Sequence, residues 1–291
     1  MMSKLLKGGP IAKVIRKEIK SKILEHISKG ILPTLSVLIA GDDPAVEVYT
    51  GMIEKNCGKV GAAFKVYRFA EEISTEKLVT EITAINNDPI VHGLIIMLPL
   101  WKHIDEKTIL NSISPDKDID GVHPINVGKN VLGEETFVPS TAQASKDILN
   151  YSDIDISGKH VVILGRSNIV GKPLANLLVQ KADGANATVT VCHSRTKNLK
   201  ELCSSADVLV AAIGSPNFIT EEFTNPDQII VDVGMNESKD VEGNYMLLGD
   251  VDFNSVAEKV AAITPVPGGV SPLTNTALLN NLLKAVKIQT K

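Results

Sequence analysis

The sequence lacks the features that mark membrane-spanning, secreted and metal-dependent proteins. No apolar run approaches the ~20 residues that a helix needs to span a bilayer, and the lysine-containing N-terminus has no apolar signal-peptide core. Only three of the 291 residues are cysteines, Cys57, Cys192 and Cys203, and neither they nor the six scattered histidines have metal-ligand spacing. We therefore expect no metal site, free thiols and a cytoplasmic location.

The sequence also lacks an excess of charge of one sign. Thirty-four acidic and 30 basic residues give a net charge of −4, which provides no electrostatic footprint for nucleic acid or an anionic membrane. A hydrophobic content of 44% is ordinary for a globular chain, and the length allows one or two domains. We expect a small molecule as partner, and neither nucleic acid nor a membrane.

Apolar stretches with the periodicity of strands alternate with stretches of helical periodicity. This alternation predicts a two-domain α/β protein with mostly parallel sheets and with ligands at the carboxyl ends of the strands. Residues 114–140 are rich in Pro, Asp, Gly and Asn and are expected to form a long irregular, functional loop. The expected strands are 35–40, 65–69, 93–98, 161–164, 188–193, 208–213, 229–233 and 246–251, and the expected helices are 11–29, 45–59, 75–86, 105–113, 141–150 and 273–288.

The run VVILGRSNIVGKPLANLL, residues 161–178, predicts a strand, a glycine turn and a helix. Unpaired N–H groups and the helix dipole make such a turn an anion site, where the pyrophosphate of a dinucleotide can bind. Ser167 replaces the second glycine of the usual G-x-G-x-x-G pattern, so the motif is weak by itself. A second expected strand, 188–193, follows at the spacing of a βαβ unit, and this context strengthens the prediction of a dinucleotide site.

Basic residues surround this turn where an NAD enzyme would have an acidic residue. Arg166 lies in the turn, and Ser194 and Arg195 follow the next strand. Two arginines and a hydroxyl suit a 2′-phosphate, which favours NADP over NAD. The alternative is that the arginines are simply solvated surface residues.

Three segments resemble the methylenetetrahydrofolate dehydrogenase/cyclohydrolase family of the FolD type: SPDKDIDGVHPINVG (114–128), GRSNIVGKP (165–173) and TPVPGGVSP (264–272). The resemblance extends over nearly the whole chain. It implies a folate-binding catalytic domain from residues 1–139 and 271–291, a Rossmann NADP-binding domain from 140–270, an active-site cleft between them, and a homodimer. Family members oxidise 5,10-methylenetetrahydrofolate to the methenyl form with NADP, and most then hydrolyse it to 10-formyltetrahydrofolate.

The resemblance also implies roles for individual residues. Asp120 falls on the carboxylate that holds the pterin ring, which fits because a carboxylate accepts two hydrogen bonds from an amino-pyrimidine edge. Taken alone, Asp120 is equally a turn-forming aspartate before Gly121. The implied substrate-binding residues are Tyr49, Leu98, Pro99, Asp120, Pro265, Pro267, Gly268 and Gly269. The implied cofactor-binding residues are Gly165, Arg166, Ser167, Ile169, Val170, Gly171, Ser194, Arg195 and Met235.

The chain departs from the family pattern at catalytic positions of the folate site. Tyr49 is present, but Ile53 stands at the position of the family's lysine and Met97 at that of its glutamine. Lys55 lies about 200° around the helix from Ile53 and is not an obvious substitute. Other departures are Val46 for a serine, Ser271 for a glycine, and the block from Pro139 to Ala144. Without the family pattern, Val46, Tyr49 and Ile53 would form an ordinary helical core stripe.

These departures lead to a specific hypothesis about the reaction. Isoleucine and methionine cannot move protons, so the cyclohydrolase step is expected to be weak or lost. Hydride transfer depends mainly on holding the donor against the cofactor, so the dehydrogenase step is expected to survive. The alternatives are a catalytically impaired NADP-binding member of the family and an NADP dehydrogenase for a different ligand.

Overall fold

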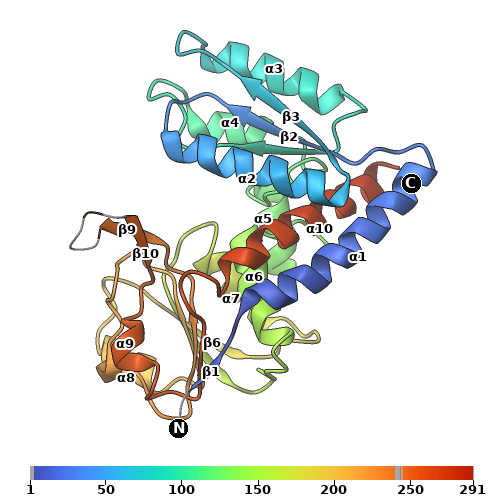
Figure 1. The fold of residues 1–291 in the computed structure, drawn as a ribbon. Helices are drawn as coiled ribbons and strands as arrows, with labels where there is room; N and C mark the ends of the chain where they lie inside the picture. The colour runs from blue at the N-terminus through green and yellow to red at the C-terminus, as the bar shows by residue number, and fades with distance from the viewer. Residues whose placement is uncertain (1–2, 240–242, 244, 291) are drawn as a thin grey trace. The chain divides into compact units, whose positions relative to one another are not determined.

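The computed structural model describes residues 3–239, 243 and 245–290, and the chain divides into two compact units (Figure 1). Unit 1 comprises residues 1–13 and 140–274, and unit 2 comprises residues 14–139 and 275–291. Helices α1 (Gly8–Ser28) and α10 (Ser271–Gln289) each begin in unit 1 and continue in unit 2. The first residues belong to unit 1 because β1 (Lys4–Leu5) pairs in parallel with β11 (Ala262–Ile263).

Unit 1 is built on a six-stranded sheet whose neighbouring strands are all parallel, in the order β1-β11-β8-β7-β5-β6. Its central strands are apolar runs buried on both faces, as parallel sheets covered by helices require. The parallel α/β prediction is confirmed. The further strands are β5 (His160–Leu164), β6 (Thr188–Cys192), β7 (Val208–Ala211) and β8 (Ile229–Asp232), and the further helices are α6 (Ser140–Asn150), α7 (Gly171–Val179), α8 (Leu199–Ser204), the 3₁₀ turn Glu221–Phe223 and α9 (Phe253–Val256).

One expected strand of unit 1 lies outside this sheet. The strand predicted at 246–251 is β10 (Tyr245–Leu248), and it pairs antiparallel with β9 (Asn236–Lys239) to form a separate hairpin. Its side chains are exposed or half-buried.

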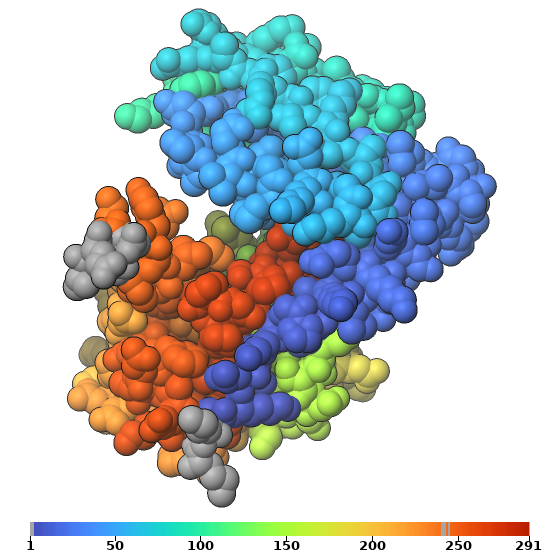
Figure 2. Space-filling view, viewed as in Figure 1, coloured from blue at the N-terminus to red at the C-terminus, as the bar shows by residue number. Residues whose placement is uncertain are grey.

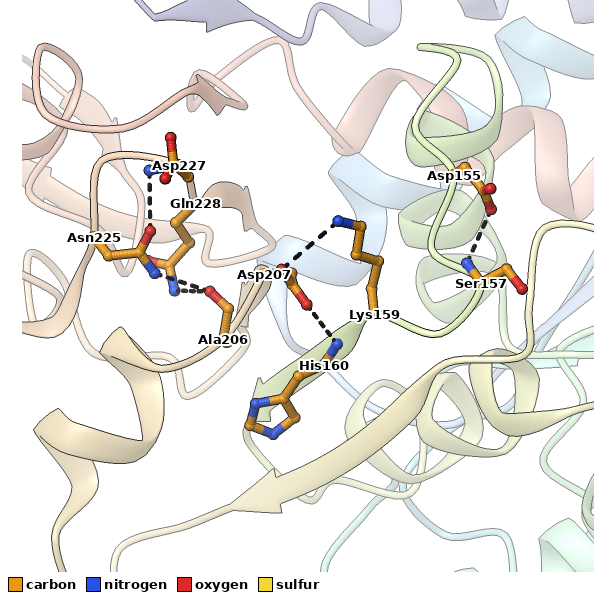
Figure 3. Close-up of polar contacts among 9 residues, drawn as sticks. All are labelled: Asp155, Ser157, Lys159, His160, Ala206, Asp207, Asn225, Asp227 and Gln228. Atoms are coloured by element: carbon orange, nitrogen blue, oxygen red, sulfur yellow. Dashed lines mark hydrogen bonds and ion pairs between the residues drawn. The ribbon is translucent and has the colours of Figure 1, made fainter.

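The amino-terminal edge of the sheet in unit 1 is closed by side-chain bonds to the backbone (Figure 3). The Asp207 carboxylate accepts a 2.7 Å hydrogen bond from the His160 N–H and lies 3.8 Å from the Lys159 ammonium. The side-chain amides of Asn225 and Gln228 both donate to the Ala206 carbonyl, at 3.1 and 2.9 Å. These bonds satisfy backbone N–H and C=O groups in the turns that precede the strands.

Unit 2 has a three-stranded parallel sheet in the order β3-β2-β4. All residues of the central strand β2 are buried, and residues of β2, α3, β4 and α4 share an apolar cluster. Helices α2 and α3 each bury an apolar stripe, which includes Ile53 in α2 and Ile82 in α3, and their segments are light blue to cyan in the space-filling view (Figure 2). The elements are β2 (Thr34–Ile39), α2 (Pro44–Val60), β3 (Ala63–Arg68), α3 (Thr75–Asn87), β4 (Gly93–Ile96), α4 (Glu106–Ser112) and α5 (Pro124–Leu132).

The expectation of one irregular loop over 114–140 is wrong, because helix α5 lies inside it. The helix has an inverted pattern: Asn126 and Asn130 are buried, whereas Val131 and Leu132 are exposed. Apolar periodicity therefore does not reveal it. Its start is fixed by a side-chain cap, since the His123 ring accepts the Ile125 N–H at 3.1 Å.

Candidate functional site

The predicted glycine turn lies between β5 and α7 of unit 1. Gly165 has φ +134°, and a Cβ atom there would stand 2.1 Å from the Ala212 carbonyl oxygen. A Cβ atom at Gly171 would stand 2.1 Å from the Gly165 carbonyl oxygen. Both positions therefore require glycine, and their absent side chains let the strand, turn and helix approach closely.

The N-terminus of α7 faces this turn without a side-chain cap. The helix begins at Gly171, two residues before Pro173, and the Ser167 hydroxyl accepts the Val170 N–H at 3.1 Å. In the first turn the Lys172 N–H donates to the Ser167 carbonyl at 3.1 Å and Pro173 has no N–H, so the positive end of the helix dipole is what favours an anion beside the turn. The turn thus has the chemistry of a pyrophosphate site.

The predicted basic residues leave the ends of two adjacent strands. Leu164 of β5 pairs with Cys192 of β6, so Arg166 and Ser194 follow neighbouring strand ends at the same edge of the sheet. Arg166, Ser194 and Arg195 are all exposed. This arrangement leaves their side chains available to an anion bound beside the turn.

A cavity of about 240 Å³ opens at the carboxyl edge of the sheet in unit 1. It brings together six of the residues predicted to bind cofactor or substrate: Val170, Met235, Pro265, Pro267, Gly268 and Gly269. The other lining residues are Thr141, Asp232, Val233, Gly234, Leu247, Val266, Val270, Ser271 and Thr274. Most of the lining is apolar or glycine, as expected of a site for a planar ring.

Asp232 lines this cavity and was missed by the sequence reasoning. It is the last residue of β8, so the rule that ligands bind at the carboxyl ends of parallel strands could have found it. Its carboxylate accepts the N–H groups of Gly234, Asp250 and Val251 at 2.9–3.0 Å. Burial, and secondarily the charge of Asp250, raises the pKa of Asp232 to about 6.

In unit 2, the buried face of α2 includes Ile53, the position at which the resemblance leads us to expect a lysine. Ile53 is 1% exposed and Met97, which follows β4, is 5% exposed, while Tyr49 is half-buried. Lys55 is exposed on another face of the helix. The two positions expected to move protons are therefore apolar and buried.

Leu98 and Pro99 follow β4 at the carboxyl edge of the sheet in unit 2. They are joined by a cis peptide bond and are exposed. A Cβ atom at Gly41, just after β2, would stand 2.4 Å from the Pro99 carbonyl oxygen. Only a glycine at 41 allows these two strand ends to approach so closely.

Asp120 lies on a rigid frame at the same edge, because Asp118 forms a parallel bridge with Leu94 of β4. The Asn281 amide of α10 donates to the carbonyls of Ile119 and Val138, at 2.8 and 2.9 Å. Burial, and then the charge of Asp118, raises the pKa of Asp120 to about 7. Leu98, Pro99 and Asp120 thus lie at one edge of the sheet, and Tyr49 lies in α2, the helix that follows β2 at that edge.

The described part of the chain contains neither a candidate metal cluster nor a candidate membrane span. Among those residues, no three potential ligands cluster as a metal site would need. No helix within the same ranges combines the length and hydropathy of a membrane span.

Family models match both parts of the chain. Residues 6–120 match the catalytic domain of tetrahydrofolate dehydrogenase/cyclohydrolase, and residues 139–290 match its NAD(P)-binding domain. The second match confirms a nicotinamide dinucleotide as the expected cofactor class.

Relatives match the chain along its whole length. The bifunctional protein FolD of Chlamydia felis is 46% identical over 279 residues, 95% of this chain and 96% of the relative. The solved FolD of Campylobacter jejuni has a TM-score of 0.92 at 41% identity, covering 98% of this chain and 99% of that one. The Trypanosoma brucei enzyme, solved with NADP cofactor and inhibitor, has a TM-score of 0.91 at 34% identity, covering 100% and 99%. The chain therefore belongs to the tetrahydrofolate dehydrogenase/cyclohydrolase family.

Proposed function

We propose that this protein oxidises 5,10-methylenetetrahydrofolate to 5,10-methenyltetrahydrofolate with NADP, and that it hydrolyses the product weakly or not at all. Family membership supports the dehydrogenase. The observation that carries the second part is the burial of two apolar side chains, Ile53 and Met97, where the family has its lysine and glutamine.

The residues of unit 1 fit NADP. The glycine turn and the positive end of the α7 dipole would hold the pyrophosphate, and Arg166, Ser194 and Arg195 would hold the 2′-phosphate. The apolar cavity around Val170 and Met235 would hold the nicotinamide. When bound, NADP⁺ supplies a hydride acceptor. The NADP complex of the Trypanosoma brucei relative supports this choice of cofactor.

The residues of unit 2 divide between binding and chemistry. Asp120 would accept hydrogen bonds from the amino-pyrimidine edge of the pterin, with Tyr49, Leu98 and Pro99 beside the ligand. Hydrolysis of the methenyl bridge needs a group that moves protons to or from water. Ile53 and Met97 have no such group, so they can shape the site but cannot perform this step.

The test is to mix the protein with 5,10-methylenetetrahydrofolate and NADP⁺ and to follow NADPH and the methenyl product by absorbance. We expect NADPH to form while the methenyl product accumulates. NADPH formation with immediate loss of methenyl absorbance, faster than in a protein-free control, would show an active cyclohydrolase. Nucleotide binding without NADPH formation would favour an impaired member or a different ligand.

Arg166→Ala is expected to lower the preference for NADP over NAD by about 10- to 100-fold, because a charged hydrogen bond contributes about 1.5–3 kcal/mol. The ratio of the two dissociation constants measures this effect. Lys181→Ala removes the same charge from an exposed residue beyond the opposite end of α7, and should leave the ratio unchanged. An equal ratio in wild type and Arg166→Ala would contradict the assignment.

We also propose a homodimer and a cytoplasmic location. Strand β6 is at an edge of the sheet in unit 1, with one side free to pair within the described structure, and Val191 is 37% exposed. The three cysteines are free and buried, in keeping with a reducing compartment. Analytical ultracentrifugation should give twice the mass of one chain.

A further inference from the structure

The cavity of unit 1 contains one charge. Among the described residues that line it, Asp232 is the one ionisable side chain, and the rest are apolar, glycine, serine or threonine. We infer that Asp232 selects the oxidation state of the cofactor, by favouring the positively charged oxidised nicotinamide over the neutral reduced ring. This inference rests on the proposed function, which places the nicotinamide in this cavity.

The carboxylate is held in place from three directions. It accepts N–H groups from Gly234, Asp250 and Val251, and the Thr264 hydroxyl donates to the Asp232 carbonyl while accepting its N–H. A Cβ atom at Gly249 would stand 1.8 Å from the carboxylate, so glycine at 249 is what allows the close approach. The charge is therefore fixed at the wall of the cavity.

The three N–H groups do not fully replace the water that burial removes. Asp232 is 4% exposed, and its pKa of about 6 shows that its negative charge is less stable here than in water. It is nevertheless ionised at neutral pH. An under-solvated anion at a water-poor wall attracts a nearby cation more strongly than an exposed one would.

The two forms of the cofactor share the pyrophosphate and the 2′-phosphate and differ in the charge of the nicotinamide ring. The ratio of their dissociation constants therefore isolates the effect of Asp232 from that of the turn and the arginines. A preference for NADP⁺ favours capture of the oxidised cofactor and release of NADPH, which suits the oxidative direction of the proposed reaction.

Asp250 provides a matched control. It is fully buried, and its carboxylate accepts the N–H groups of Ile213, Gly214 and Ser215 at 2.7–3.0 Å. It resembles Asp232 in burial and in bonding to backbone, but it does not line the cavity. Asp250→Asn thus reports the loss of a similar buried charge without removing one from the cavity wall.

The experiment is isothermal titration of wild type, Asp232→Asn and Asp250→Asn with NADP⁺ and with NADPH, at about pH 8. We expect wild type to prefer NADP⁺, and Asp232→Asn to reduce this preference by at least about tenfold, which a unit charge at an effective dielectric constant of about 20 produces even from about 12 Å. Asp250→Asn should change it by less than Asp232→Asn does, because Asp250 does not line the cavity. Equal weakening of both forms in Asp232→Asn would overturn the inference, whereas failure of wild type to bind either form would overturn the proposed function.

Wild type provides a second test if Asp232→Asn does not fold. Protonation removes the charge, so the preference for NADP⁺ should fall as the pH is lowered through about 6. Asp250 is the other carboxylate beside Asp232, while the surrounding segments present Val170, Leu247 and Thr264, which do not titrate. Titration of the 2′-phosphate affects NADP⁺ and NADPH alike, so it cancels in the ratio of their dissociation constants. A preference that stays constant from about pH 8 to about pH 5 would count against the inference.

Discussion

The double variant Ile53→Lys/Met97→Gln is expected to gain hydrolysis of 5,10-methenyltetrahydrofolate by about 10²–10⁴-fold over wild type, the usual contribution of a general acid–base group. Ile53 is 1% exposed, so a lysine there would be largely desolvated and its pKa lowered toward neutrality. The glutamine at 97 would supply a polar partner for that amine. Wild type has neither group.

The measurement is the decay of methenyl absorbance in the absence of nucleotide, corrected for the spontaneous reaction. Ile53→Leu/Met97→Leu is the matched control, since it changes both side chains without adding a proton-transferring group. Lysine at a buried position lowers stability, so the melting temperature of each variant is measured in parallel. A folded double variant that hydrolyses no faster than wild type would show that the loss extends beyond these two positions.

Asp120→Asn is expected to weaken binding of the folate by about 100-fold while leaving nucleotide binding unchanged. The amide keeps one acceptor oxygen but presents an NH2 donor where the second acceptor was, so one charge-assisted hydrogen bond becomes neutral and the other is lost. Asp116→Asn is the control, because Asp116 is exposed and belongs to the same segment. A similar loss of nucleotide affinity in Asp120→Asn would indicate unfolding instead of a lost contact.

The same residue predicts the pH dependence of folate binding. Because the pKa of Asp120 is about 7, the carboxylate is mostly protonated at about pH 6 and mostly ionised at about pH 8. The ionised form is the better acceptor, so affinity should rise with pH across this window and be lost as the pH falls through 7. Asp120→Asn should show no such rise. Folate affinity of wild type that does not change across the window would refute the role of the ionised form.

Local patterns explain why much of the site could be predicted. Gly165 and Gly171 are required by backbone positions that no side chain can occupy, and such requirements are visible in sequence as a glycine turn after an apolar run. Tyr49 and Ile53 lie one turn apart on the same face of α2, because residues at i and i+4 are neighbours on a helix surface. These features depend on residues close together in the chain.

Features that depend on distant residues were missed. Helix α5 carries buried Asn126 and Asn130, and the side chain of Asn126 is hydrogen-bonded to Asp118 and Thr136, which lie eight and ten residues away. Short elements such as β1 and β11 carry too few residues for periodicity, and they are stable because they pair across more than 250 positions. Neither the buried hydrogen-bond partners of α5 nor the pairing of β1 with β11 can be recognised from a short stretch of sequence.

The sequence by itself determined the alternation of strands and helices, the glycine turn with its basic residues, and the apolar residues at Ile53 and Met97. Each is a matter of residue type at a fixed local spacing, which local backbone geometry converts directly into structure. Only the tertiary structure decided that Asp232 and Asp250 lie side by side and that one of them lines the cavity. Burial, pKa and the sharing of backbone N–H groups are set by segments that meet only when the sheet is assembled, so no local pattern can contain them.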